Sequence, residues 1–183
     1  GDLYEGHFKD GKMHGKGKYT WVDGNVYEGD YTDGRKHGQG KLTGANGTVY
    51  EGEFQNVEFH GKGTLTMPNG EVYKGDWKNG RMQGKGKYTY LNGDVYEGDF
   101  TDGEKHGKGK ETNADGNVYE GDYKDNKKHG KGKYTGADGE VYEGDFKDGK
   151  LTSGGKTRVS KKRTSDEPLD EQAGSSKRRK TSE

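Results

Sequence analysis

The stretch YEGDFTDGEKHGKG, residues 96–109, decides the fold of this chain. In its first half, aromatic or glycine residues alternate with acidic ones, which is the period-2 pattern of a half-buried β-strand. The pair Asp102-Gly103 is a turn signal, because glycine adopts the positive φ that tight hairpin turns require. The second half, rich in glycine and lysine, then returns as an antiparallel strand. The stretch therefore predicts one β-hairpin.

The same hairpin recurs with a fixed period. A tyrosine returns every 23 residues without an insertion, and a second aromatic residue follows four positions later. The two series are Tyr4, Tyr27, Tyr50, Tyr73, Tyr96, Tyr119 and Tyr142, and Phe8, Tyr31, Phe54, Trp77, Phe100, Tyr123 and Phe146. Regular self-similarity indicates a repeat architecture in which each unit packs on its neighbours. We predict an all-β fold over residues 1–152: a single-layer, twisted antiparallel meander of six complete β-hairpin repeats and a partial seventh, with about thirteen strands.

Composition favours a thin sheet over a globule with a thick core. The 183 residues include 13 Tyr, 5 Phe, 2 Trp and 36 Gly, and 32 basic residues balance 32 acidic ones. Large rings can lie over glycine because it has no side chain. The chain contains no cysteine, which excludes disulfides and thiolate metal sites. No apolar run approaches the roughly 20 residues of a membrane-spanning helix.

The two faces of the predicted sheet differ. One face should carry the Val, Tyr, Gly and second aromatic residue of each first strand. The other should carry acidic residues opposite lysines of the neighbouring strands, such as Glu97 and Asp99 opposite Lys85 and Lys87. Cross-strand pairs of this kind contribute roughly 0.2–1 kcal/mol each. The near-zero net charge is therefore expected to be structural.

The run at residues 96–109 resembles the MORN (membrane occupation and recognition nexus) repeat, and the resemblance covers residues 1–152. It implies a single-layer antiparallel sheet, often dimeric, that works as a scaffold or tether. Three residues depart from the pattern. Lys74 replaces the usual acid, Val57 replaces the turn glycine, and His7 replaces the acid of the first unit.

Motifs that could carry chemistry have simpler explanations. Five histidines share one repeat position, but successive copies lie two strands, roughly 10 Å, apart, too far to share a metal ion. The Gly-Lys-Gly-Lys segments do not match the phosphate-binding loop Gly-x4-Gly-Lys-Ser/Thr. Every serine lies at position 153 or later, outside the repeats. We therefore predict no catalytic residue, no metal site and no cofactor.

The main functional hypothesis is a non-catalytic protein-binding scaffold that can self-associate into a homodimer. Its candidate binding face is the two aromatic series given above, from Tyr4 and Phe8 to Tyr142 and Phe146. Tyrosine and tryptophan are common anchors at protein interfaces. The expected edge strands, residues 3–8 and 141–146, present unpaired backbone groups that favour strand addition.

Two alternatives remain open. The resemblance and the basic tail favour a phosphoinositide-binding membrane tether, although the repeats carry 23 basic and 27 acidic residues, 23 − 27 = −4. The segment could also be a regulatory part of a larger enzyme, of the phosphatidylinositol-phosphate kinase or lysine methyltransferase type. Specific nucleic-acid binding is not expected, since contacts made by the tail would be non-specific.

Residues 153–183 form a separate segment, rich in Ser, Lys and Arg, that we expect to be disordered. Its charge is 9 − 5 = +4. Its two basic clusters resemble a bipartite nuclear localisation signal that importin would bind: Lys161, Lys162 and Arg163, then Lys177, Arg178, Arg179 and Lys180. Thr181 and Ser182 are candidate phosphorylation sites beside the second cluster. We expect a location in the nucleus or cytoplasm, with the nucleus favoured.

Overall fold

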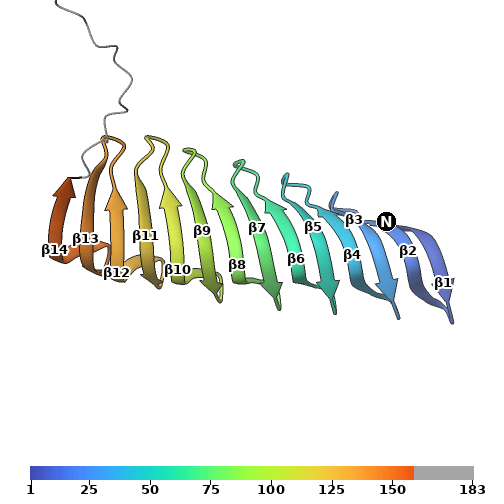
Figure 1. Ribbon diagram of the computed structural model, residues 1–183. Coiled ribbons are helices and arrows are strands. Elements are labelled where there is room, and N and C mark those ends of the chain that lie inside the picture. The colour runs from blue at the N-terminus through green and yellow to red at the C-terminus, as the bar shows by residue number, and fades with distance from the viewer. Residues whose placement is uncertain (159–183) are drawn as a thin grey trace, which may run out of the picture.

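The computed structural model describes residues 1–158, which form one open antiparallel sheet of fourteen strands in sequence order (Figure 1). Each strand pairs with the strands that precede and follow it. This part of the chain contains no helix long and apolar enough to span a membrane. The strands are β1 Leu3–Lys9, β2 Lys12–Thr20, β3 Val26–Thr32, β4 Arg35–Thr43, β5 Val49–Gln55, β6 Glu58–Thr66, β7 Val72–Lys78, β8 Arg81–Thr89, β9 Val95–Thr101, β10 Glu104–Thr112, β11 Val118–Lys124, β12 Lys127–Thr135, β13 Glu140–Lys147 and β14 Lys150–Arg158.

The sheet confirms the predicted meander of hairpins and extends it at its C-terminal end. The seventh unit keeps its second strand, so the described chain has fourteen strands rather than about thirteen. Strand β14 continues to Arg158, past the predicted end of the repeats at residue 152. It pairs along all of β13, with Gly144 opposite Gly154. The prediction that residues 141–146 form an edge strand is therefore wrong, because β13 is covered by β14.

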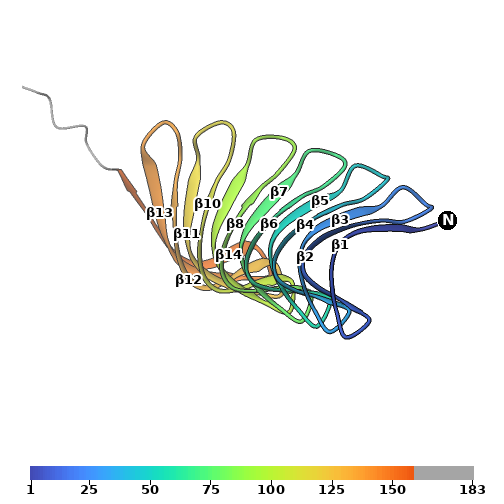
Figure 2. The same cartoon turned by 90° about the vertical axis from the view of Figure 1, so that its right-hand side faces the viewer.

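Each strand bends near its middle. Viewed from the β1 end, the sheet therefore has the profile of an open V (Figure 2). Glycine pairs lie at the close approach of neighbouring strands, for example Gly29 opposite Gly40. A Cβ atom at Gly40 would collide with the ring of Tyr27. The Tyr27 ring lies over this glycine, and its hydroxyl donates to the carbonyl oxygen of Asp30 at 2.9 Å. Each repeat thus uses glycine to let a tyrosine lie flat on backbone.

The core is a continuous ladder of rings along one face. Each first-strand tyrosine from Tyr4 to Tyr119 contacts the second aromatic residue of its own unit and that of the next unit. Tyr27, for instance, contacts Tyr31 and Phe54 at centroid distances of 5.2 and 5.0 Å, with nearly perpendicular planes. Edge-to-face pairs add roughly 0.5–1.5 kcal/mol beyond the burial of their area. We call the fourteen rings of the two series the aromatic ladder.

Candidate docking surface

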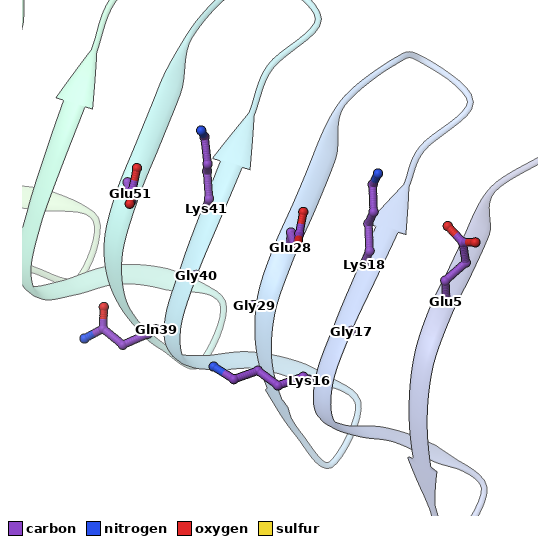
Figure 3. Close-up of a pocket in the computed structure, with 10 residues that line it drawn as sticks. All are labelled: Glu5, Lys16, Gly17, Lys18, Glu28, Gly29, Gln39, Gly40, Lys41 and Glu51. Carbon is purple, nitrogen blue, oxygen red and sulfur yellow. The ribbon is translucent and has the colours of Figure 1, made fainter.

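The charged face is an array of cross-strand ion pairs. Lys85 Nζ lies 2.6 Å from Asp99 Oδ1, and Lys87 Nζ lies 2.9 Å from Glu97 Oε1, which confirms the expected pairing. Figure 3 shows the same arrangement near the N-terminus, where Glu5, Lys18, Glu28, Lys41 and Glu51 follow one another on successive strands. These residues border an open hollow of about 680 Å³. Acidic and basic groups alternate around it, so it offers no surface of one sign.

The first-strand valines lie on this charged face and not beside the tyrosines as predicted. Val49 lines a second open hollow together with Glu51 and Glu53. The reason is the strict alternation of side chains along a strand, which places adjacent Val49 and Tyr50 on opposite faces.

The second acid of each first strand does more than form an ion pair. Asp99 accepts a hydrogen bond from the backbone N–H of Lys108 at 3.0 Å while its other oxygen meets Lys85. Partial burial opposes its ionisation, but these bonds lower the pKa of Asp99 overall. One carboxylate therefore links three strands, β8, β9 and β10. Asp30 and Asp76 make the same backbone bond to Gln39 and Lys85.

The aromatic ladder is buried. Eleven of the fourteen rings predicted to form the binding face belong to the buried core, and Tyr27, Tyr50, Tyr73 and Tyr96 have no exposed surface. The exceptions lie near the ends of the sheet: Phe8 is 64 % exposed, and Tyr4 and Tyr142 are partly buried. The ladder therefore serves mainly as the core, because neighbouring units cover both sides of each ring.

A second set of side chains covers the ladder and faces outward, and we call it the apolar strip. Its members are half-buried and come mostly from second strands or the loops that follow them. Phe59 stacks on Tyr50 at 3.7 Å with an angle of 6° between the rings. The members are Met13, Tyr19, Trp21, Leu42, Phe59, Leu65, Met82, Tyr88 and Tyr90. These nine belong to the first four units, and in the sixth unit Tyr134 also packs against the ladder.

In the next two units, three of the four equivalent strand positions carry charges: Lys105, Glu111 and Lys128. We call these three residues the ionic cluster. Glu111 lies between Lys105 at 2.8 Å and Lys128 at 3.1 Å. Lys105 also lies over the rings of Tyr90, Tyr96 and Tyr123 at 5.1 to 5.4 Å. Burial opposes the charge of Lys105, but hydrogen bonding with Glu111 leaves its pKa raised. The face is thus divided into an apolar part and an ionic part.

The loops that connect successive repeats form one long edge of the sheet, which we call the acidic edge. The six loops, residues 20–25, 43–48, 66–71, 89–94, 112–117 and 135–140, contain no lysine or arginine. Their acids are Asp23, Glu71, Asp94, Asp115, Asp138 and Glu140. On the opposite edge, the hairpin turns contain basic residues such as Lys78, Arg81 and Lys124. These turns also contain acids, such as Asp33, Asp102 and Asp148, so the turn edge carries both signs whereas the loop edge carries only acids.

Five of the six histidines lie at or beside the bulges of the second strands, whereas His7 lies in β1. No group of potential metal-ligating side chains is found within residues 1–158. His106 Nδ1 lies 3.4 Å from Asp125. The predicted localisation clusters and phosphorylation sites, from Lys161 to Ser182, lie outside the described residues. They remain predictions.

Comparison with known proteins agrees with this architecture. A family model described as the MORN repeat matches residues 4–26, 27–49, 50–72, 73–95, 96–118, 119–141 and 142–152. No curated protein matches the sequence. One similar solved structure is the TCP domain of SAS-4 (dCPAP) of Drosophila melanogaster, in complex with a proline-rich motif of Ana2 (dSTIL). It is 15 % identical over 88 % of this chain and 79 % of that chain, with a TM-score of 0.43.

A streptogramin B lyase is similar at 14 % identity over 79 % of this chain and 59 % of that chain, with a TM-score of 0.20. The family model instead accounts for nearly all of the described sheet, unit by unit. MORN repeats are generally non-catalytic and build repeat scaffolds. The fourteen-stranded sheet and the seven matched units show that this chain belongs to the MORN-repeat family.

Proposed function

We propose that this chain is a protein-binding scaffold and that the apolar strip is its docking surface. The proposal rests on the difference in exposure between the aromatic ladder and the apolar strip that covers it on the same face. The ladder below is buried within the sheet, whereas Met13, Phe59, Met82 and Tyr88 above it keep exposed surface. Apolar side chains that pack on the core with one side and keep exposed surface on the other can form an interaction site. Methionine also suits a docking surface, because its unbranched side chain adapts to different partners.

The partner that fits this surface presents apolar side chains in an extended segment. The strip is long and narrow, since it follows the sheet across β2, β4, β6 and β8. Lys36, which lies 5.4 Å from the Trp21 ring, and the ionic cluster provide charges beside it. Apolar anchors would supply affinity, and these charges would set the register.

The test is selection of peptides from a phage-displayed library on the full-length protein. Peptides with apolar anchors should be enriched, and binding should fall at least tenfold in the double variant Phe59→Ser/Met82→Ser. The matched control Lys41→Ser/Lys87→Ser changes the charged face and should bind as the parent does. Enriched peptides that bind all three proteins equally would contradict the proposal, as would a failure to enrich any peptide.

A phosphoinositide tether is less well supported. The lysine rows that would contact lipid phosphates are matched by carboxylates, as in Lys108–Asp122 and Lys131–Asp145 at 2.6 and 2.7 Å. Co-sedimentation with phosphoinositide vesicles at about 0.15 M salt, where the Debye length is roughly 8 Å, would decide this alternative. Binding that survives removal of residues 159–183 would favour it over the scaffold.

A further inference from the structure

We propose that the basic cluster at residues 177–180 of this same chain docks in a hollow where the acidic edge meets the ionic cluster. The hollow is open, measures about 620 Å³ and is lined by Glu71, Tyr90, Leu91, Asn92, Asp94, Lys105 and Glu111. This contact is separate from the partner site of the proposed function, although the two surfaces adjoin at Tyr90.

The acids of this hollow have capacity for a cation. Glu71 accepts from the Tyr88 hydroxyl at 2.8 Å and from the backbone N–H of Leu91 at 3.4 Å. Asp94 accepts from the Asn92 amide at 2.9 Å and from the backbone N–H of Ala114 at 2.9 Å. All of these donors are neutral. A carboxylate has about four lone-pair positions, so each acid can accept further bonds from a guanidinium or ammonium group.

No basic residue of the described chain, residues 1–158, pairs with these two acids. Lys105 lines the hollow, but its charge is met by Glu111. Hydrogen bonding from Tyr88 lowers the pKa of Glu71, which keeps this carboxylate ionised near neutral pH. The two carboxylates of the hollow are thus half-buried and have no basic partner among residues 1–158.

The rest of the hollow suits the aliphatic and planar parts of lysine and arginine. Leu91 is 69 % exposed, and beside it lies the half-buried ring of Tyr90, which has Lys105 Nζ 5.3 Å from its centroid. A lysine or arginine chain can cover such apolar surface while its charged end meets a carboxylate. The combination of ring, apolar stem contact and unpaired acids fits a basic peptide segment.

The path of the chain brings a suitable segment to this place. Strand β14 ends at Arg158, opposite Glu140, so the described chain ends at the acidic edge. The hollow lies at the loop before β9, five strands away, which is about 24 Å at 4.8 Å per strand. Lys177 follows Arg158 by 177 − 158 = 19 residues. A random coil of that length has a root-mean-square span of about 24 Å.

This span is within reach of the chain that follows Arg158, whereas the far acids of the same edge are not. For a tether of fixed length, the effective concentration falls steeply once the distance to a site exceeds the r.m.s. length of the tether. The loop that holds Asp23, before β3, is eleven strands from β14, or about 53 Å away. Docking would cover the residues that we expect importin to recognise, so that the sheet would control access to them.

The absence of cysteine makes a direct test straightforward. In the full-length variant Ser176→Cys, a nitroxide label would lie beside the cluster. We expect backbone amide signals of residues 90–94 to broaden at least threefold more than those of residues 21–25. The difference should disappear in Glu71→Gln/Asp94→Asn, whose amides keep the backbone bonds. It should persist in the matched control Asp2→Asn/Asp23→Asn. This variant removes the same charge at the first loop, where Asp2 accepts from the backbone N–H of Val22 at 2.9 Å.

Three results would overturn the proposal. The first is broadening of residues 90–94 that is no greater than that of residues 21–25. The second is broadening that Glu71→Gln/Asp94→Asn does not change. The third is broadening that fades on tenfold dilution, which would show that the contact forms between molecules. None of these results bears on peptide binding by Phe59 and Met82, so the docking proposal and the proposed function can fail independently.

Discussion

At the scale of the residue, glycine and tyrosine act as one unit. The ring of Tyr27 occupies the space where a Cβ atom at Gly40 would lie, and Gly17, Gly63, Gly86 and Gly109 hold equivalent positions beneath other tyrosines. The arrangement buries a large ring in a sheet that has only one layer. The tyrosine ring can therefore be buried only where glycine leaves the backbone beneath it uncovered.

Gly40→Ala should destabilise the protein by about 1–3 kcal/mol, because the added methyl group displaces the Tyr27 ring. Urea unfolding followed by tyrosine fluorescence measures this loss. Gly155→Ala is the matched control, since no atom lies within 4 Å of a Cβ built there. Equal losses in the two variants would show that the tyrosine–glycine contact does not contribute to the free energy of unfolding.

Lys74 interrupts the cross-strand pairing of acidic and basic residues on the charged face. It lies directly opposite Lys87, whereas four other units place a glutamate opposite a lysine at this position, as in Glu97 opposite Lys110. Like charges in this arrangement oppose each other, so Lys74→Glu should stabilise the sheet by about 0.2–1 kcal/mol. Thermal unfolding in low salt should show the gain, and 0.5 M NaCl should reduce it. A gain that is independent of salt would rule out the electrostatic explanation.

At the scale of the element, the hairpin turn tests how strictly the repeat requires glycine. Val57 has φ of 72° at the turn between β5 and β6, a conformation that opposes a β-branched side chain. Val57→Gly should raise stability by about 1 kcal/mol, which corresponds to about 2–4 °C in Tm for a chain of this size. Differential scanning calorimetry would measure it.

Asn126 provides the contrast for that turn. Its φ of 68° is similar, but its side chain accepts from the Lys105 backbone N–H at 2.9 Å and donates to Glu104. Asn126→Gly removes both bonds, so we expect no gain or a loss. If both substitutions stabilise equally, positive φ alone determines the effect.

The hairpins could be predicted from sequence because alternation, turn signals and a constant period all agree. The apolar strip and the ionic cluster could not be predicted in this way. Between Gly98–Gly109 and Phe100–Lys105, the first strand advances by two residues and the second by four, so each second strand contains a bulge. Strict alternation therefore fails there, and it gives no means of assigning Phe59, Met82 or Lys105 to a face. The conspicuous tyrosines, by contrast, proved to be core.

At the scale of the whole molecule, the ladder links stability to pH. Burial raises the pKa of Tyr119 to about 12, and it raises the pKa of Tyr27, Tyr50, Tyr73 and Tyr96 as well. In the unfolded chain these hydroxyls ionise near 10. The ladder's contribution should be complete below pH 10 and should decline as the pH rises toward 12, because the unfolded state then loses protons first.

Urea midpoints measured at half-unit steps between pH 8 and pH 11 would check this expectation. The midpoint should fall steeply above pH 10, and absorbance at 295 nm should show the tyrosines ionising together with unfolding. Ionisation in the folded protein near pH 10, without loss of structure, would contradict the burial of the rings.

The meander, in which each strand pairs only with its neighbours in sequence, has a mechanical consequence. The first and last strands lie at opposite ends of the sheet, so a pull on the two ends of the described chain acts across the strands (Figure 1). Backbone bonds then break one after another, as in a zipper, instead of all together. Each 23-residue unit that opens would exchange about 10 Å of sheet for nearly 80 Å of extended chain. Under load the described sheet should therefore lengthen one unit at a time, at a force well below that needed to shear strands along their length.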